Sequence, residues 1–451
     1  MSIIIPANSA AGGLGYQVAN SLRFNRPSSD SLNRTQSGGS ATTKITFSTW
    51  IKRTNLGIET WMFDAPNSSN QSDGLRFLTN DTIMFLLSDT YTLTTNRVFR
   101  DTSAWYHLVV AMDTTQNTDS NRVKLYVNGV QETSFSATSY PSQNATAQGL
   151  FVSGRPLYVG RQSGGNYLDG YLAETVFIDN QALAPTSFGE FDSDSGVWKP
   201  IDVSDLTFGT NGAYLDFEDS SALGNDAAGS NNFSVNNLAA IDQTTDTCTN
   251  NFCLLNPIDK GYGTINFTEG NTRGEGSGSG WHPARGSMGL SSGKWYWEMN
   301  MTGSNQMGVS NETIDMNNDN AQDLVGVTVF YNASGGIIRT DGSQVGGTTA
   351  TFASDGSDVA GYALDMDNKK LSIYKNGSII VTNTALSTSI TNFALPFFSV
   401  NGGGTWSVNF GNPSVALNSA VADGNGYGAF EYAPPTGYFA LCTINLSKEM
   451  S

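Results

Sequence analysis

The strongest constraint on the fold is a pair of short segments, one in each half of the chain, that share one pattern. They read "VKLYVNGVQ" at 123–131 and "KLSIYKNGSII" at 370–380. In each, an alternating apolar run meets Asn-Gly and a second run follows. Such a pattern indicates a β-hairpin, because both central residues of a type I′ turn need a positive φ. We therefore predict hairpins that turn at Asn128 and at Asn376.

The pattern extends to the strand before each hairpin. That strand ends in Met-Asp, at 112–113 and again at 366–367, and an Asn-containing turn leads into the hairpin. Each copy is therefore a three-strand meander, which favours two sandwiches of related architecture. The loop "TTQNTDSN" after Asp113 is much longer than its counterpart "NKK" after Asp367. We expect any binding by these meanders to lie in the loops that differ.

The composition indicates a folded chain of strands and tight turns. The 451 residues include 49 glycines, 11% are aromatic and only 14% are charged. Dense alternating runs separated by Asn, Gly and Ser are typical of antiparallel sandwiches. We predict an all-β fold of two antiparallel jelly-roll-type β-sandwiches in series with a short N-terminal arm. The expected parts are the arm at 1–20, the first sandwich at 21–190, a structured connector that packs on one neighbour at 191–258, and the second sandwich at 259–451.

The net charge of −17 argues against a nucleic-acid partner and against attraction to an anionic membrane. No apolar run is long enough to span a bilayer, and the N-terminus lacks the basic and apolar regions of a signal peptide. We therefore expect no membrane insertion and synthesis in a cytoplasm without export. Three cysteines without a CxxC pair indicate neither a disulfide framework nor a zinc site.

Two family resemblances follow from these motifs. The segments "FSTWIKR", "WYHLVVAMD", "NRVKLYVNGVQ", "LYVGRQ" and "LDGYLAETVFIDNQAL" resemble the laminin-G-like, concanavalin-like jelly rolls. The segments "SGKWYWE", "GYALDMDNKKLSIYKNG" and "WSVNFGNP" resemble the SPRY fold, another bent two-sheet sandwich.

The whole arrangement also resembles structural proteins of marine tailed phages. The phrases that carry this resemblance are "NSLRFNRPSSDSLNRT", "FGEFDSDSGVWKP" and "TDTCTNNFCLLNP". It implies a protein of the virion surface, which is made in the host cytoplasm and leaves by lysis. Such a protein needs no signal peptide.

Few residues in the chain suit catalysis. Of the two histidines, His107 lies within a strand, where it is read as a satisfied sheet residue. Glycoside hydrolysis needs a pair of carboxyl groups, but Glu174 stands alone on its strand. We therefore expect a protein that is not an enzyme.

Binding of a sugar would use exposed aromatic rings together with Asn or Asp hydrogen bonds. The candidates are Trp281 with His282, Tyr331 and Tyr167, each of which also has a purely structural interpretation. The loop at 314–323 offers oxygen ligands for Ca²⁺, although it lacks the glycine and the terminal Glu of an EF-hand; the alternative is a solvated acidic loop. The candidate calcium ligands are Asp315, Asn317, Asp319 and Asp323. No other cofactor is expected.

The favoured hypothesis is a non-enzymatic virion surface protein, such as a tail fibre, spike or head fibre, that binds a host-surface glycan or receptor through its sandwich loops. An apolar anchor in the arm, formed by Ile3, Ile4, Ile5 and Pro6, would attach it to capsid or tail proteins. Weak sites add through effective concentration, so we expect a homo-oligomer, with a trimer natural for a fibre. The alternatives are a capsid decoration protein without a ligand and a polysaccharide depolymerase.

Overall fold

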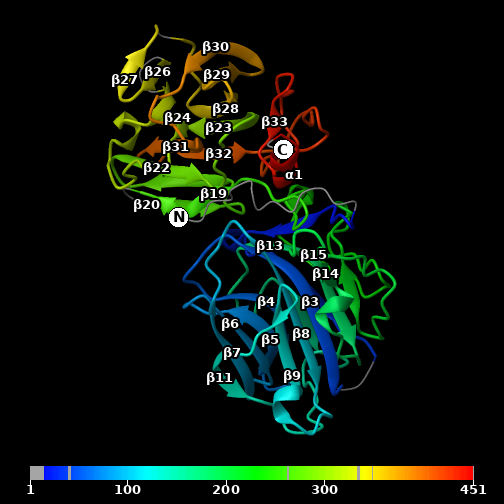
Figure 1. Ribbon diagram of the computed structural model, residues 1–451. Coiled ribbons are helices and arrows are strands. Elements are labelled where there is room, and N and C mark those ends of the chain that lie inside the picture. The colour runs from blue at the N-terminus through cyan, green and yellow to red at the C-terminus, as the bar shows by residue number, and fades with distance from the viewer. Residues whose placement is uncertain (1–14, 39–41, 262–263, 333–335, 348, 450–451) are drawn as a thin grey trace. The chain divides into compact units, whose positions relative to one another are not determined.

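The computed structural model describes residues 15–38, 42–261, 264–332, 336–347 and 349–449 (Figure 1). These residues divide into two compact units between Thr249 and Asn250, which we call the N-terminal unit and the C-terminal unit. The division falls inside the expected connector, and residues 191–249 belong to the N-terminal unit. The proposed anchor residues Ile3, Ile4, Ile5 and Pro6 lie outside the described residues.

The N-terminal unit is a sandwich of two antiparallel sheets, each with eight described strands. Sheet A has the order β10-β9-β8-β3-β13-β1-β18, with β16 also paired to β13, and sheet B has the order β11-β7-β6-β5-β4-β12-β2-β17. The strands of sheet A are β1 (Ser21–Phe24), β3 (Lys44–Arg53), β8 (Trp105–Asp113), β9 (Val123–Val127), β10 (Val130–Gln131), β13 (Gly170–Asp179), β16 (Ala213–Leu215) and β18 (Gln243–Thr244). Those of sheet B are β2 (Ser31–Thr35), β4 (Thr60–Pro66), β5 (Ser72–Phe77), β6 (Thr82–Leu87), β7 (Tyr91–Val98), β11 (Phe135–Ser139), β12 (Pro156–Val159) and β17 (Ser234–Asn236).

The core of this unit lies between the two sheets. Because successive side chains of a strand point to opposite faces, every second residue of β3 enters the core, as Ile45, Phe47 and Ile51 do. Phe47 contacts Phe63 of β4 and Phe177 of β13, with ring centroids 4.5 and 5.0 Å apart. The alternation read from the sequence is thus confirmed.

The other face of sheet A is also covered, by the segment that follows β13. This segment forms the two-stranded sheet of β14 (Gly189–Phe191) and β15 (Trp198–Pro200). Its apolar side chains pack on the outward-facing residues of sheet A in a second cluster: Val109, Val176, Ile178, Phe188, Val203, Phe208 and Tyr214. We call residues 183–214 the covering segment of the N-terminal unit. Because sheet A is buried on both faces, β13 is buried along its whole length.

The C-terminal unit is a second sandwich. Sheet C has the order β19-β22-β31-β24-β25-β26-β27, and sheet D has the order β20-β21-β32-β23-β28-β29-β30, with β33 beside β23. Among the described strands, β33 and β23 form the one parallel pair. The strands of sheet C are β19 (Leu255–Lys260), β22 (Trp281–Gly286), β24 (Asn305–Ser310), β25 (Val327–Tyr331), β26 (Ile337–Thr340), β27 (Ser343–Val345) and β31 (Leu395–Asn401). Those of sheet D are β20 (Thr264–Thr268), β21 (Arg273–Ser277), β23 (Lys294–Thr302), β28 (Asp355–Asp365), β29 (Lys370–Lys375), β30 (Ser378–Ala385), β32 (Thr405–Asn409) and β33 (Phe439–Ala440).

The second core has the same plan as the first. Trp295, Trp297, Met299 and Met301 of β23 face sheet C, as the alternation predicted. On the outer face of sheet D, Tyr296 and Ala363 pack against Phe430, Ala440 and Cys442, which belong to the segment after β32. We call residues 411–442 the covering segment of the C-terminal unit; it leads into α1 (Thr443–Glu449). The predicted fold class, two antiparallel β-sandwiches, is confirmed.

Both predicted hairpins are present, and both are built in the same way. Asn128 and Gly129 join β9 to β10 with φ values of 48° and 78°, and Asn376 and Gly377 join β29 to β30 with 48° and 76°. Each Asn also bonds the third strand of its meander. The Asn128 side chain accepts from the N–H of His107 at 2.7 Å, and that of Asn376 accepts from the N–H of Val359 at 2.8 Å. In each hairpin, the side chain of the turn Asn therefore adds a hydrogen bond to the neighbouring strand, beyond the end of the strand pairing.

An aromatic ring from the covering segment lies on each turn glycine. A Cβ added to Gly129 would collide with the ring of Trp198, and one added to Gly377 would collide with the ring of Tyr432. The absence of a side chain thus serves two purposes here: it permits the positive φ, and it lets the ring pack onto the turn.

We expect Gly129→Ala to lower the free energy of unfolding by about 1 to 3 kcal/mol, because it adds both backbone strain and a clash with Trp198. Urea denaturation of the full chain measures this. Gly164→Ala is the control, since a Cβ there meets nothing within 4 Å, and its effect should stay within about 0.5 kcal/mol. Equal effects of the two variants would contradict the role given to the turn.

Candidate functional site

Two of the aromatic residues selected from the sequence meet on the surface of the C-terminal unit. Trp281 begins β22 and Tyr331 ends β25, on strands that are not neighbours in sheet C. Their ring centroids are 5.5 Å apart in an edge-to-face arrangement with an interplanar angle of 73°. Both side chains are partly exposed. The sequence analysis expected loop residues; the structure places both at strand ends.

The surroundings of this pair hold it in place. The guanidinium of Arg339 lies over the Tyr331 ring, 5.6 Å from its centroid, and forms an ion pair with Asp323. The backbone N–H of Trp281 donates a hydrogen bond to Oδ1 of Asp319 at 2.7 Å. Trp281 and Tyr331 are thus fixed from several sides, while both remain partly exposed. We call Trp281, Tyr331, Arg339, Asp319 and Asp323 the Trp281 cluster.

The acidic loop contributes to this cluster rather than to a metal site. Asp323 is engaged by Arg339, Asp319 by the Trp281 backbone, and Asp315 by the N–H of Asn317 at 3.0 Å. Among the described residues, no group of three or more His, Cys, Asp or Glu side chains is placed to hold a metal ion. Asp315, Asp319 and Asp323 therefore do not form a group placed to hold a metal ion.

His282 does not belong to the surface of the Trp281 cluster. It follows Trp281 on β22, so its side chain points to the opposite face, into the sandwich, and only 1% of it is exposed. Neither ring nitrogen has a hydrogen-bond partner among the described residues. The interpretation of His282 as a loop ligand beside Trp281 is wrong, since strand alternation separates the two side chains.

Tyr167 lies in the N-terminal unit, apart from the other candidates. Its ring packs against the guanidinium of Arg161, which lies 5.0 Å from the Tyr167 centroid and 5.1 Å from that of Tyr158. The guanidinium also donates to the carbonyl oxygens of Gln162 and Ser163. Tyr167 thus helps to fix the loop between β12 and β13.

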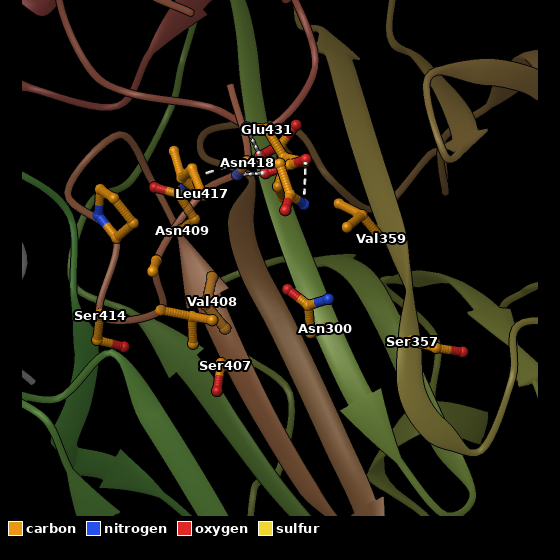
Figure 2. Close-up of a pocket in the computed structure, with 14 residues that line it drawn as sticks. Asn300, Ser357, Val359, Ser407, Val408, Asn409, Ser414, Leu417, Asn418 and Glu431 are labelled. Atoms are coloured by element: carbon orange, nitrogen blue, oxygen red, sulfur yellow. Dashed lines mark hydrogen bonds between the residues drawn. The ribbon is translucent and has the colours of Figure 1, made fainter. Parts of the chain in front are cut away.

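A pocket that the sequence analysis missed lies on the outer face of sheet D (Figure 2). Its volume is about 190 Å³, and it opens between β32, β23 and β28 on one side and residues 413–418 on the other. Asn300 pairs with Ser407 on β32 and with Val359 on β28, so the three side chains form a row across the sheet. Only the register of strands distant in sequence brings them together, and no local motif predicts it.

Two glutamates line this pocket, and both serve as fixed acceptors. Glu298 accepts from the N–H groups of Glu431 and Tyr432 at 2.7 and 2.8 Å, from the Tyr296 hydroxyl and from the Asn409 amide. Glu431 accepts twice from Asn418, at 2.8 Å each, as Figure 2 shows. Burial raises the pKa of Glu298. The Glu298 contacts attach the covering segment to sheet D, and the Glu431 contacts with Asn418 hold the covering segment together.

His107 and Glu174, the catalytic candidates considered in the N-terminal unit, lie under its covering segment. The His107 ring accepts from Trp198 Nε1 at Nδ1, at 3.0 Å, and Nε2 lies 2.9 Å from the Ser48 hydroxyl. Because Nδ1 accepts, Nε2 carries the proton and donates to Ser48. Burial lowers the pKa of His107 to about 3, so the ring is neutral and structural.

Glu174 sits at a register shift of β13 with a φ of 46°, an unusual value for a residue other than glycine. Oε2 accepts from the hydroxyls of Tyr214 and Tyr16 at 2.8 and 3.2 Å. Burial raises the pKa of this carboxyl to about 7. Glu174 is thus buried and held by two tyrosine hydroxyls.

Comparison with known proteins agrees with the fold of the N-terminal unit. Residues 27–186 match the Laminin_G_3 model, described as the concanavalin A-like lectin/glucanases superfamily. The predicted concanavalin-like sandwich is thus confirmed for this part of the chain. No curated protein sequence matches the chain.

Three solved structures were compared with the chain. Stonustoxin is 19% identical over 35% of this chain, with a TM-score of 0.29, and the match takes in 27% of the stonustoxin chain. The SPRY domain of human HERC1 is 19% identical over 34% of this chain and 96% of its own, with a TM-score of 0.29. The PSpry domain of TRIM65 is 13% identical over 35% of this chain and 91% of its own, with a TM-score of 0.28. Likeness at this level carries no inference about what this chain binds.

The two buried histidines should respond oppositely to replacement by leucine. His282→Leu removes two unpaired buried nitrogens and should raise the free energy of unfolding by about 1 kcal/mol. His107→Leu removes the acceptor of Trp198 Nε1 and should lower it by about 1 to 3 kcal/mol. Urea denaturation of both variants tests this, and a clear destabilisation by His282→Leu would show that its nitrogens do have partners.

Glu174 should make the N-terminal unit less stable as the pH rises. Its pKa in the folded state, about 7, exceeds the ordinary value of 4.5, so its contribution is complete below about pH 4.5 and is lost as the pH rises through 7. Glu174→Gln should therefore gain melting temperature relative to wild type between pH 5 and pH 8. The exposed Glu275→Gln in the C-terminal unit is the control, and parallel curves for wild type and Glu174→Gln would refute the expectation.

Proposed function

We propose that this chain is a non-enzymatic protein of a phage virion surface and that its C-terminal unit binds a host-surface glycan at the Trp281 cluster. The observation that carries the proposal is the contact between Trp281 and Tyr331. Two partly exposed rings from strands far apart in the sequence are locked together, with Arg339 and Asp323 beside them. A preformed aromatic surface with polar groups at its edge is the usual construction of a small-ligand site.

The charges of the cluster favour an uncharged ligand. Arg339 is neutralised by Asp323, and Asp319 accepts from a backbone N–H. The partly exposed aromatic rings of Trp281 and Tyr331 are apolar and flat, which suits the C–H face of a sugar ring. The match of residues 27–186 to a superfamily described by lectins and glucanases is a second support for a saccharide ligand.

The proposal that the protein is not an enzyme rests on how its carboxylates are used. The pocket in Figure 2 contains both Glu298 and Glu431, so it is the place where a depolymerase would have its catalytic pair. Yet both oxygens of each carboxylate already accept hydrogen bonds from the covering segment or from sheet D. A general acid must carry a proton and reach the substrate, and these hydrogen bonds oppose both requirements.

The virion setting of the proposal rests on the sequence. The phage-like phrases at 20–35, 188–200 and 245–257 support it, and the arm with Ile3, Ile4, Ile5 and Pro6 is the segment proposed to contact capsid or tail proteins. A trimer would present several weak glycan sites at once and raise the overall affinity through effective concentration. No helix within the described residues is long and apolar enough to cross a membrane.

We expect Trp281→Ala to weaken binding of the purified protein to extracted host-surface glycans at least about tenfold, which corresponds to 1.4 kcal/mol. Surface plasmon resonance on immobilised glycan measures this. Phe191→Ala, which removes an aromatic side chain that is 52% exposed in the N-terminal unit, is the matched control and should bind as wild type does.

Two outcomes of the same experiment favour the alternatives. New reducing ends in glycan incubated with the protein would identify a depolymerase. Unchanged glycan with no binding, together with antibody labelling of many copies over the phage head, would identify a decoration protein without a ligand.

A further inference from the structure

The N-terminal unit has a pocket of its own, and it lies at the loop that distinguishes the two meanders. The pocket has a volume of about 350 Å³ and opens on the outer face of sheet A, where β8 and β9 meet the segment at 182–184. Ala111 pairs with Lys124 and Val109 with Tyr126, so the side chains of Lys124 and Tyr126 leave the sheet on this outer face. The loop after Asp113 adds Gln116 and Asn121.

Arg122 holds this loop in one shape. Its guanidinium donates to the carbonyl oxygens of Gln116, Asn117 and Pro141 at 2.9, 3.0 and 2.9 Å. The Gln143 amide adds a bond to the Thr115 carbonyl at 3.2 Å. The pocket wall is therefore preformed, and a ligand that enters does not have to order the loop first.

Lys124 lines this pocket without an ion-pair or hydrogen-bond partner among the described residues. The hydroxyl of Tyr126 also forms no hydrogen bond with a described residue. Asp113, the carboxylate in the pocket, is already occupied by Thr115, Gln116 and, at 3.5 Å, the ammonium of Lys44. The unpaired ammonium of Lys124 therefore favours a ligand that places a negative group beside it.

The other lining groups indicate which anion. The ring of Tyr126 and the side chains of Ala182, Leu183 and Ala184 supply the apolar part of the lining, while Gln116 and Asn121 offer amides that can both donate and accept. A flat ring substituted with hydroxyls and one carboxylate satisfies all of these. We propose that this pocket binds a uronic acid unit of a polysaccharide, with its carboxylate at Lys124 and its hydroxyls at Gln116, Asn121 and Tyr126.

The inference does not depend on the Trp281 cluster, which lies in the other unit.

The probe is a trimer of galacturonic acid, and its methyl ester is the neutral counterpart with the same sugar ring. Isothermal titration calorimetry with the full chain should show binding of the acid at least about tenfold tighter than of the ester, because a charge-assisted hydrogen bond contributes about 1.5 to 3 kcal/mol. The difference should shrink as the salt concentration rises.

Lys124→Gln keeps the length of the side chain and removes its charge. It should bind acid and ester alike, at least about tenfold more weakly than wild type binds the acid. Lys369→Gln in the C-terminal unit is the matched control and should leave the preference for the acid unchanged. Trp281→Ala should also leave it unchanged, so that failure here and failure of the Trp281 cluster can be told apart.

Four results would overturn the inference. The first is equal affinity of wild type for acid and ester, and the second is an unchanged preference for the acid in Lys124→Gln. The third is binding of a short polyglutamate peptide as tight as that of the sugar acid, which would show that the pocket recognises charge without the sugar ring. Absence of heat with the acid up to millimolar concentration counts against it as well.

Discussion

The structure of each unit depends on a segment that covers the outer face of one of its two sheets. A sandwich buries the inner faces of its two sheets, but here sheet A and sheet D are each apolar on their outer faces too, with Val109, Val176 and Ile178 in one unit and Tyr296 and Ala363 in the other. Such faces are stable only when something removes them from water. Each unit does this with the chain that follows its sandwich, and in each an aromatic ring, of Trp198 or Tyr432, packs onto the glycine of the Asn-Gly hairpin. The glycine is therefore a docking point as well as a turn residue.

This covering also determines where a ligand can bind. A segment laid over a sheet covers it incompletely, and each of the pockets described lies at the edge of such cover: one beside residues 182–184 on sheet A, the other beside residues 413–418 on sheet D. Their linings differ because the loops differ. The long loop after Asp113 gives the first pocket its amides, whereas the second is lined by Glu298, which holds the covering segment, and by Glu431, which bonds within that segment.

The sequence predicted the features that depend on a local pattern of residues. Alternation placed Phe47 and Trp297 in the cores, and Asn-Gly placed both turns, because these depend on residues adjacent in the chain. It also selected Trp281 and Tyr331, although not their contact. It failed where the outcome depends on strands that meet across a sheet: His282 was taken for a loop residue, and the row of Asn300, Ser407 and Val359 was missed. The hydrogen bond from the N–H of His107 to the Asn128 side chain was equally hidden, since it joins the turn to the neighbouring strand β8 only after folding.

The acidic composition has a structural use that bears on function. Asp73 is buried and accepts from the N–H groups of Ser88, Gln148, Gly149 and Leu150, and Glu298 accepts from those of Glu431 and Tyr432. Each such carboxylate attaches a long loop to a sheet through donors that the loop would otherwise leave unpaired. The backbone N–H groups of loops are not paired within a helix or a sheet, so they need acceptors of this kind. A chain with many loops and few helices therefore needs many such acceptors. Negative charge in these loops therefore serves the fold, because each buried carboxylate fixes a loop to its sheet.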